Sequence, residues 1–130
     1  MNKLLVVIIS TSILLTLSFP SAFATSYTIA DTLTGGDCVA LGGTWDNVLK
    51  ICTVNNLTIN SVDTLQINSG ITFVIDGLLL LSGNLNNDGT IEIHILRILS
   101  GGVMSNLITG TINNNGNFDP DFVAYGENLN

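Results

Sequence analysis

Glycine recurs through the second half of the chain, largely at six-residue intervals, and this spacing limits the fold more than any other feature. The glycines concerned are Gly77, Gly83, Gly89, Gly101, Gly110 and Gly116. Two positions after each of them stands an apolar residue: Leu79, Leu85, Ile91, Val103, Ile112 and Phe118. A unit this short cannot enclose its own core, so it must stack on further copies of itself. The pattern predicts an all-β fold, a small single-stranded β-solenoid over residues 54–118.

Alternation of apolar and polar residues supports the same fold. It is clearest in the runs 57–59, 65–67 and 71–75, which turn residues separate. Because six is an even number, a six-residue repeat keeps the same positions facing inward at every pass. Three such arms would form an 18-residue coil, whose handedness the sequence leaves open. A β-sandwich of hairpins is the alternative, but its turns usually lie 8–12 residues apart.

Two kinds of segment depart from the regular repeat. Residues 91–99 lack a glycine at the expected midpoint, and they could form fused strands or a short helix. Their β-branched content favours strand. The asparagine runs 86–87 and 113–115 are expected at corners, where asparagine tolerates unusual backbone angles and can form amide ladders.

Residues 1–24 have the layout of a secretory signal peptide. Lys3 precedes an apolar run over residues 4–17, and Ala22-Phe23-Ala24 matches a cleavage site. The run of about 14 residues is short for a membrane span, although an uncleaved anchor is the alternative. We therefore expect a secreted or cell-surface protein with no membrane span after cleavage.

The net negative charge of the expected mature chain limits the classes of partner that it could bind. Cleavage would leave two basic residues, Lys50 and Arg97, against ten acidic ones. Such a chain cannot neutralise a row of phosphates, so nucleic acid is not an expected partner. Anionic membrane surfaces are disfavoured for the same reason.

The only two cysteines, Cys38 and Cys52, bracket a segment that contains the single tryptophan, Trp45. In an exported protein this pair predicts a disulfide rather than half of a metal site. We expect residues 25–53 to form a lead-in and a disulfide-stapled N-terminal cap over the exposed end of the solenoid. Trp45 would pack in that cap, with a sugar-stacking platform as the alternative. Residues 119–130 are expected to form an acidic C-terminal tail.

Few residues could carry chemistry. Glu92 and His94 would share one face of a strand near Arg97, and could act as an acid–base pair or form a solvated outer face. Asp76 and Asp88 each precede a glycine, which fits either an Asp-Gly turn or loose calcium binding. We prefer the solvated face and the turn, so we assign no catalytic residue, cofactor or metal site.

One modification site can be named. Asn56 begins the single Asn-x-Thr sequon and could carry a glycan in an exported protein.

The segment CVALGGTW…CTV at residues 38–54, followed by phrases such as LTINS and GTINNNG, resembles a group of secreted proteins rich in asparagine and glycine. We associate this group mainly with ammonia-oxidising archaea. There a cysteine-bracketed GGTW segment precedes repeats predicted to form β-solenoids. The resemblance covers about residues 38–118. It implies a fold and an extracellular location, and it carries over no catalytic residue.

These observations lead to a functional expectation. The chain should be a non-enzymatic structural or adhesion protein of the cell surface or the extracellular space, self-associating through its coil ends or binding a cell-envelope partner. The alternative is a carbohydrate-binding or polysaccharide-processing β-helix, for which the available residues are Asp63, Asp76, Asp88, Glu92 and Arg97. A binder of ice or mineral would need outward ranks of threonine, and Thr58, Thr72, Thr90 and Thr111 look scattered in the sequence.

Overall fold

The computed structural model describes residues 23–114, and in this range all regular structure is β-strand. Residues 1–22 of the predicted signal at 1–24, residues 115–118 of the predicted repeat and the tail at 119–130 lie outside the described residues. The strands are β1 (Ser26–Ile29), β2 (Thr44–Asp46), β3 (Ile51–Val54), β4 (Leu57–Ile59), β5 (Thr64–Ile67), β6 (Thr72–Leu81), β7 (Asn84–Asn87), β8 (Thr90–Ile98), β9 (Val103–Asn106) and β10 (Thr111–Asn114). The predicted β-solenoid is confirmed.

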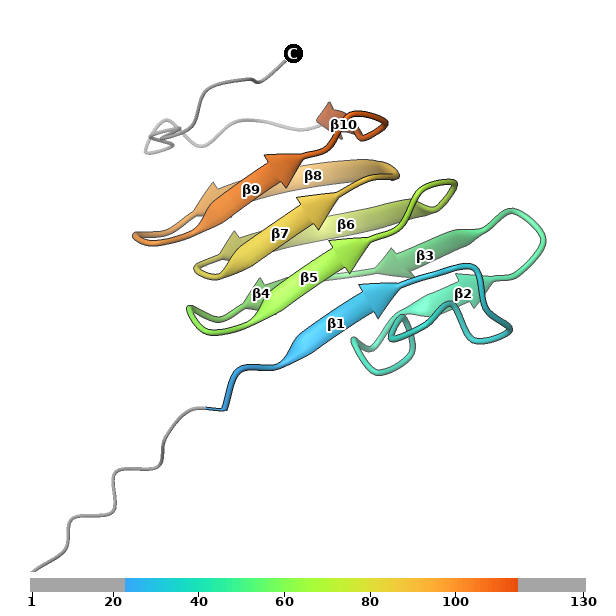
Figure 1. The fold of residues 1–130 in the computed structure, drawn as a ribbon, viewed down its shortest axis with the longest axis horizontal. Helices are drawn as coiled ribbons and strands as arrows, with labels where there is room; N and C mark the ends of the chain where they lie inside the picture. The colour runs from blue at the N-terminus through green and yellow to red at the C-terminus, as the bar shows by residue number, and fades with distance from the viewer. Residues whose placement is uncertain (1–22, 115–130) are drawn as a thin grey trace, which may run out of the picture.

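The strands form two parallel stacks that face one another (Figure 1). We call the stack β1-β5-β7-β9 sheet A. Sheet B has the order β10-β8-β6-β3-β2, and β4 pairs with the second half of β6. The chain passes from one sheet to the other and back, so each circuit adds one strand to each stack. Three complete coils and part of a fourth result.

The coil length is close to the expected value. Thr72 lies beside Thr90, eighteen residues later, and Thr90 lies beside Thr111, twenty-one residues later. The first coil already includes β1 and β3, which belong to the range 25–53 that we expected to hold the lead-in and cap. The cap is therefore an insertion between β1 and β3 of the first coil.

Gly77, Gly83 and Gly89 mark the three successive corners of one coil. Gly77 lies within β6, where sheet B bends, and the other two lie at the connections on either side of β7. None of the three has a positive φ. At each corner a Cβ atom would instead overlap the chain of the preceding coil; at Gly89 it would lie 2.6 Å from the Asn68 carbonyl oxygen. Close approach of the backbones therefore requires these glycines.

The next coil departs from the regular glycine spacing. Gly101 adopts a positive φ of 86° in a turn, and Gly102 takes the tight corner position beside the Leu81 carbonyl. The core position opposite Leu85 is consequently filled by Met104. The expectation that Val103 points inward is wrong, because the corner lies one residue later and Val103 faces solvent.

Inward-facing side chains form a continuous aliphatic core. Phe73 is its largest member and lies between Cys52 and Ile91 in the neighbouring strands of sheet B. Leu65 and Leu85 stack in the same way in sheet A, and both are fully buried. Burial of each such side chain adds about 1.5–3 kcal/mol to the free energy of unfolding, relative to leaving it exposed.

The irregular segment at residues 91–99 lies almost entirely within the continuous strand β8. This confirms strand rather than helix. β6 accommodates one more residue at the sheet B bend, because Ile75 pairs with Ile93 whereas Leu78 pairs with Ile95. β8 therefore makes the same bend without a glycine.

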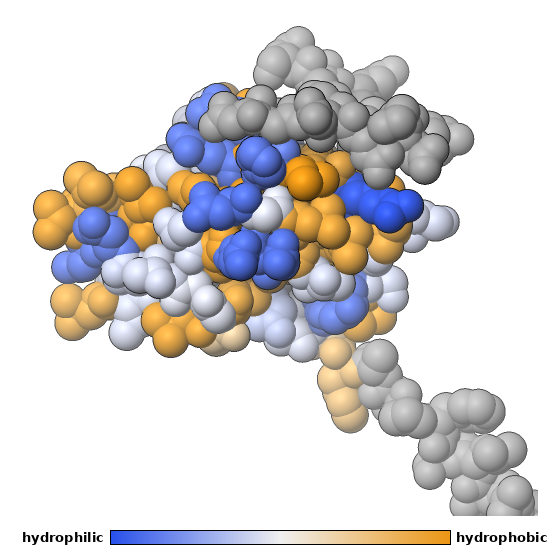
Figure 2. All heavy atoms as spheres, turned by 180° about the vertical axis from the view of Figure 1, so that it is seen from behind, coloured by the Kyte–Doolittle hydropathy of each residue, from blue (hydrophilic) through white to orange (hydrophobic). Residues whose placement is uncertain are grey.

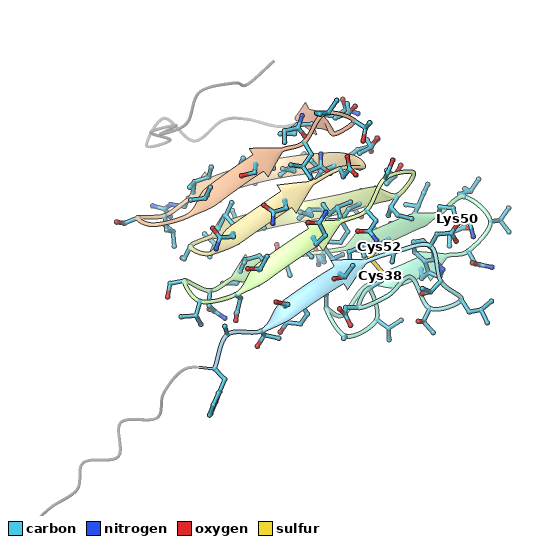
Figure 3. All side chains as sticks on the ribbon, viewed as in Figure 1. Cys38, Lys50 and Cys52 are labelled. Atoms are coloured by element: carbon cyan, nitrogen blue, oxygen red, sulfur yellow. A yellow bond between two sulfur atoms is a disulfide. The ribbon has the colours of Figure 1, made fainter. Side chains whose placement is uncertain are left out.

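The cap covers β3 at the N-terminal end of sheet B. β2 runs antiparallel to β3, which ends the parallel stack, and Cys38 forms the predicted disulfide with Cys52 (Figure 3). Both cysteines are fully buried. Trp45 packs against the core, and Gly35, with a φ of 71°, lies against its indole ring. This arrangement supports packing rather than a sugar platform as the role of Trp45.

Candidate interaction surfaces

The outer face of sheet A is polar except at Val103 and carries no charge. Each strand of the sheet contributes two outward residues, so the face consists of two ranks of four. The first rank is Ser26, Thr64, Asn84 and Val103, and the second is Thr28, Gln66, Asn86 and Ser105. Hydroxyl and amide groups can donate and accept hydrogen bonds, so this face suits neutral polar partners.

The outer face of sheet B carries a row of threonines that the sequence did not reveal. Thr72, Thr90 and Thr111 are consecutive partners in the ladder, with Ile51 below them. The expectation that these threonines are scattered is therefore wrong for three of the four; Thr58 lies apart, on β4. The neighbouring rank is irregular because it combines Thr53, Val74, Glu92 and Asn113. A single regular row does not make the array that a binder of an ordered surface needs.

A shallow, open hollow lies on this same face. Asp76, Glu92 and His94 line it together with parts of Val74, Ile75 and Ile93. The sequence placed Glu92 beside His94, and the fold adds Asp76 from the adjacent strand. Arg97 lies farther along β8, beside Leu80. Within the described residues no hydrogen bond or ion pair joins these four side chains; the one ion pair found there is between Lys50 and Asp31.

Asp76 and Asp88 occupy different corners of the coil. Asp76 lies at the bend within β6, whereas Asp88 lies in the connection between β7 and β8. The Thr109 hydroxyl contacts the Asp88 carboxylate and donates to its main-chain oxygen at 2.8 Å. Across residues 23–114, no three His, Cys, Asp or Glu side chains are grouped as a metal site would require. The two aspartates are thus not equivalent positions of a repeated ion site.

Asn86 and Asn87 lie within β7 rather than at a corner, so the expected position of this run is wrong. Asn86 faces outward, but Asn87 is fully buried and continues the inward rank of Ile29 and Ile67. Its amide nitrogen donates to Asn106 Oδ1 at 2.8 Å and to the Thr111 carbonyl at 3.0 Å. A single amide–amide hydrogen bond, rather than the expected ladder at the corners, therefore joins two coils inside the stack.

Asn56 is exposed at the corner below Gly77, as a glycosylation site must be. Its side-chain oxygen accepts the Leu78 N–H at 2.9 Å. A glycan would be attached to the other atom of the amide, the nitrogen, so the corner bond and the modification are compatible.

The N-terminal end of sheet A is closed by a side chain. The Asp37 carboxylate accepts the Thr28 N–H at 2.7 Å, and the Asp37 N–H donates to the Thr28 carbonyl at 2.9 Å. Both outward polar groups at the centre of the β1 edge are therefore satisfied. The repeat gave no signal for this role, because Asp37 lies outside it in a Gly-Gly-Asp sequence.

The other end of the stack has parallel strands at its edge. Within residues 23–114, β9 and β10 are bonded on one side only, at the same end of the molecule (Figure 1), whereas at the first end Asp37 covers the centre of β1 and antiparallel β2 covers β3. Val103 and Thr111 donate to the preceding coil, so the alternate groups, at Met104 and Ile112, point away from the stack. An edge of this kind can pair with another strand.

Asp63, whose role the sequence did not reveal, is buried immediately before β5. Hydrogen bonds from the Thr25 N–H and from the Asn60 side chain hold the pKa of Asp63 below its usual value, although its burial acts in the opposite direction. The sequence offered Asp63 only as a groove carboxylate, and its burial rules out that role.

Exposed large apolar residues gather at two places, the cap and the last coil, where Leu99, Val103, Leu107 and Ile108 are exposed. The cap holds the other group. Four large ones are exposed there: Leu33, Val39, Val48 and Leu49. From behind, the molecule shows hydrophilic residues interspersed among hydrophobic ones over the middle of the face, with hydrophobic residues projecting at the side where the cap lies (Figure 2).

Comparison with protein-family models, with curated proteins and with solved structures found no match for this chain. In the part of the chain that the structure describes, no helix has the length and apolar character needed to cross a membrane.

Proposed function

We propose that the protein is a non-enzymatic structural or adhesion component of the cell surface or extracellular space that self-associates through its C-terminal coil. The observation that carries this proposal is the difference between the two ends of the stack. At the N-terminal end, Asp37 occupies the centre of the β1 edge, and the short antiparallel strand β2 covers β3. At the other end, β9 and β10 present backbone groups without partners among the described residues.

This difference determines the kind of assembly. Head-to-tail stacking would require free parallel edges on β1 and β3, which Asp37 and β2 occupy. Two copies can instead meet end to end around a two-fold axis, which brings their last strands together antiparallel. Such pairing is closed, so it yields a dimer of coaxial stacks. Exposed Leu107 and half-buried Met104 near this end would lose contact with water in the dimer.

The test is light scattering on protein eluting from a sizing column, with two lysine variants on the same outer rank of sheet A. Ser105→Lys places a charge on the edge strand β9, where two copies would meet. Asn86→Lys places the same charge one strand inward, because Asn86 is the ladder partner of Ser105. We expect dimers for the unsubstituted protein and Asn86→Lys, and monomers for Ser105→Lys. A monomeric unsubstituted protein, or equal effects of both lysines, would overturn the proposal.

A carbohydrate-binding function is the second candidate, and the hollow at Asp76, Glu92 and His94 favours it. Carboxylates and imidazoles commonly bind sugar hydroxyls by hydrogen bonds. Titration with oligosaccharides, followed by NMR, should then shift the resonances of β6 and β8, and Glu92→Gln should weaken that response. Unchanged spectra across neutral and acidic oligosaccharides would remove this candidate.

A further inference from the structure

One hydrogen bond joins the residue preceding β1 to a buried carboxylate. The Thr25 N–H donates to Asp63 Oδ1 at 2.9 Å, and the Thr25 carbonyl accepts the Thr64 N–H at 2.9 Å. Asp63 is only 6% exposed, and its second oxygen accepts the Asn60 side-chain amide at 2.9 Å. The fold therefore holds a fixed carboxylate beside the backbone nitrogen of one particular residue.

Thr25 is also the residue that follows the predicted cleavage site at Ala22-Phe23-Ala24. β1 begins one residue later, at Ser26, and residues 23 and 24 are exposed. The two observations are independent, because the cleavage pattern comes from the leader and the position of Asp63 comes from the solenoid. Both select the same nitrogen atom.

We propose that cleavage between Ala24 and Thr25 creates an α-ammonium group that forms an ion pair with Asp63. A leader peptidase adds water across this peptide bond, which leaves the carboxyl group on Ala24 and the amino group on Thr25. The new amino group takes up a proton at neutral pH, since an α-amino group ordinarily has a pKa of about 7.7–8.0. A neutral donor to Asp63 thereby becomes a cationic one in the same place.

The surroundings favour this ion pair. Hydrogen bonds between charged groups are shorter and about twice as strong as those between neutral groups. The groups that lower the pKa of Asp63 are Thr25 and Asn60, and no charged side chain contributes. The carboxylate is thus ionised and has no cationic partner within residues 23–114, so processing should stabilise the end of β1. This inference does not depend on the proposed self-association.

The first experiment identifies the N-terminus. The full chain is expressed with its own leader in a secreting host, and the recovered protein is sequenced from its N-terminus. We expect Thr25 as the first residue. A mature chain that begins elsewhere overturns the proposal.

The second experiment measures the reactivity of the amino group. The secreted protein is treated with an acylating reagent at neutral pH, and labelling of Thr25 is followed by mass spectrometry, with Lys50 as an internal reference. We expect labelling in the folded protein to be about tenfold slower than in denaturant, the change that a pKa raised by one unit would cause. Asp63→Asn should restore fast labelling, whereas Asp76→Asn, at an exposed aspartate, should not. Equal rates in the unsubstituted protein and Asp63→Asn overturn the proposal.

A third measurement covers the case in which Asp63→Asn fails to fold. The labelling rate of the unsubstituted protein is measured against pH, which gives the pKa of the Thr25 amino group directly. A value above about 8 supports the ion pair, and a value in the ordinary range or below contradicts it.

Discussion

Asp37 binds both backbone polar groups of Thr28, one through its carboxylate at 2.7 Å and the other through its own N–H at 2.9 Å. The arrangement gives the β1 edge the bonds that another strand would have supplied. Gly36 allows it, because a Cβ there would overlap the Thr28 carbonyl oxygen. A parallel stack is open at both ends unless something closes it, and here a single residue closes one edge of sheet A.

Asp37→Ala should change the form of assembly as well as the stability. Loss of the acceptor leaves the Thr28 N–H unsatisfied, at a cost of about 1–2 kcal/mol in the free energy of unfolding. The β1 edge also becomes available, so the closed dimers proposed above should give way to longer oligomers on a sizing column. Asp46→Ala is the control, because Asp46 accepts N–H groups within the cap, from Val48 and Leu49, but covers no edge strand. Identical size distributions for both variants would contradict this prediction.

Gly89→Ala should destabilise the stack strongly. The added methyl group would lie against the Asn68 and Ile71 carbonyl oxygens, which belong to the preceding coil and cannot move independently. We expect a loss of about 3 kcal/mol in urea unfolding. Gly70→Asn is the matched variant: Gly70 has a φ of 79° in open space, which asparagine tolerates, so the loss should stay below about 1 kcal/mol. Equal losses would show that turn geometry, rather than contact between coils, accounts for the glycines.

Removal of the disulfide should weaken the whole domain. Cys38 and Cys52 are 14 residues apart, and a loop of this length stabilises by about 3 kcal/mol in the chain-entropy model. The double variant Cys38→Ser and Cys52→Ser should therefore unfold at a lower urea concentration. Dithiothreitol should lower the midpoint of the unsubstituted protein in the same way and leave the double variant unchanged. Stability that resists both treatments would mean that the cap contributes little to the fold.

Acid should destabilise the protein through Asp63. Because the pKa of Asp63 is lower in the folded state than in the unfolded state, its contribution is fully present above the unfolded value of about 3.9. It is lost as the pH falls through the lower folded value. Urea unfolding between pH 5 and pH 2 should therefore show a steeper loss for the unsubstituted protein than for Asp63→Asn. Asp76→Asn should keep the steep loss, and parallel curves for all three proteins would exclude Asp63 as the cause.

The sequence was most informative where a short-range rule repeats. Alternation and glycine spacing predicted the stacked coils, and the two cysteines predicted the disulfide, because each pattern reflects a constraint that acts on neighbouring residues or on a single pair. The strand nature of residues 91–99 was predicted from their β-branched content, which is also a local property.

Features that depend on how one coil lies over another were not visible. The row of Thr72, Thr90 and Thr111 requires the register between coils, which changes from eighteen to twenty-one residues. The inward position of Met104 depends on which of two adjacent glycines takes the corner. Asp37 lies outside the repeat, and the bond between Asp63 and Thr25 joins residues 38 positions apart, so no periodic pattern could indicate either role.

The regular pairing between coils also indicates how a protein with this fold could vary in length. Because β5 and β6 bond to the coils on either side through equivalent ladders, a duplicated unit of their length could be inserted without altering the cap. Each insertion would lengthen the stack by one strand spacing, about 4.8 Å. The number of coils would then set the distance between the two ends of the molecule, and so between any partners bound there.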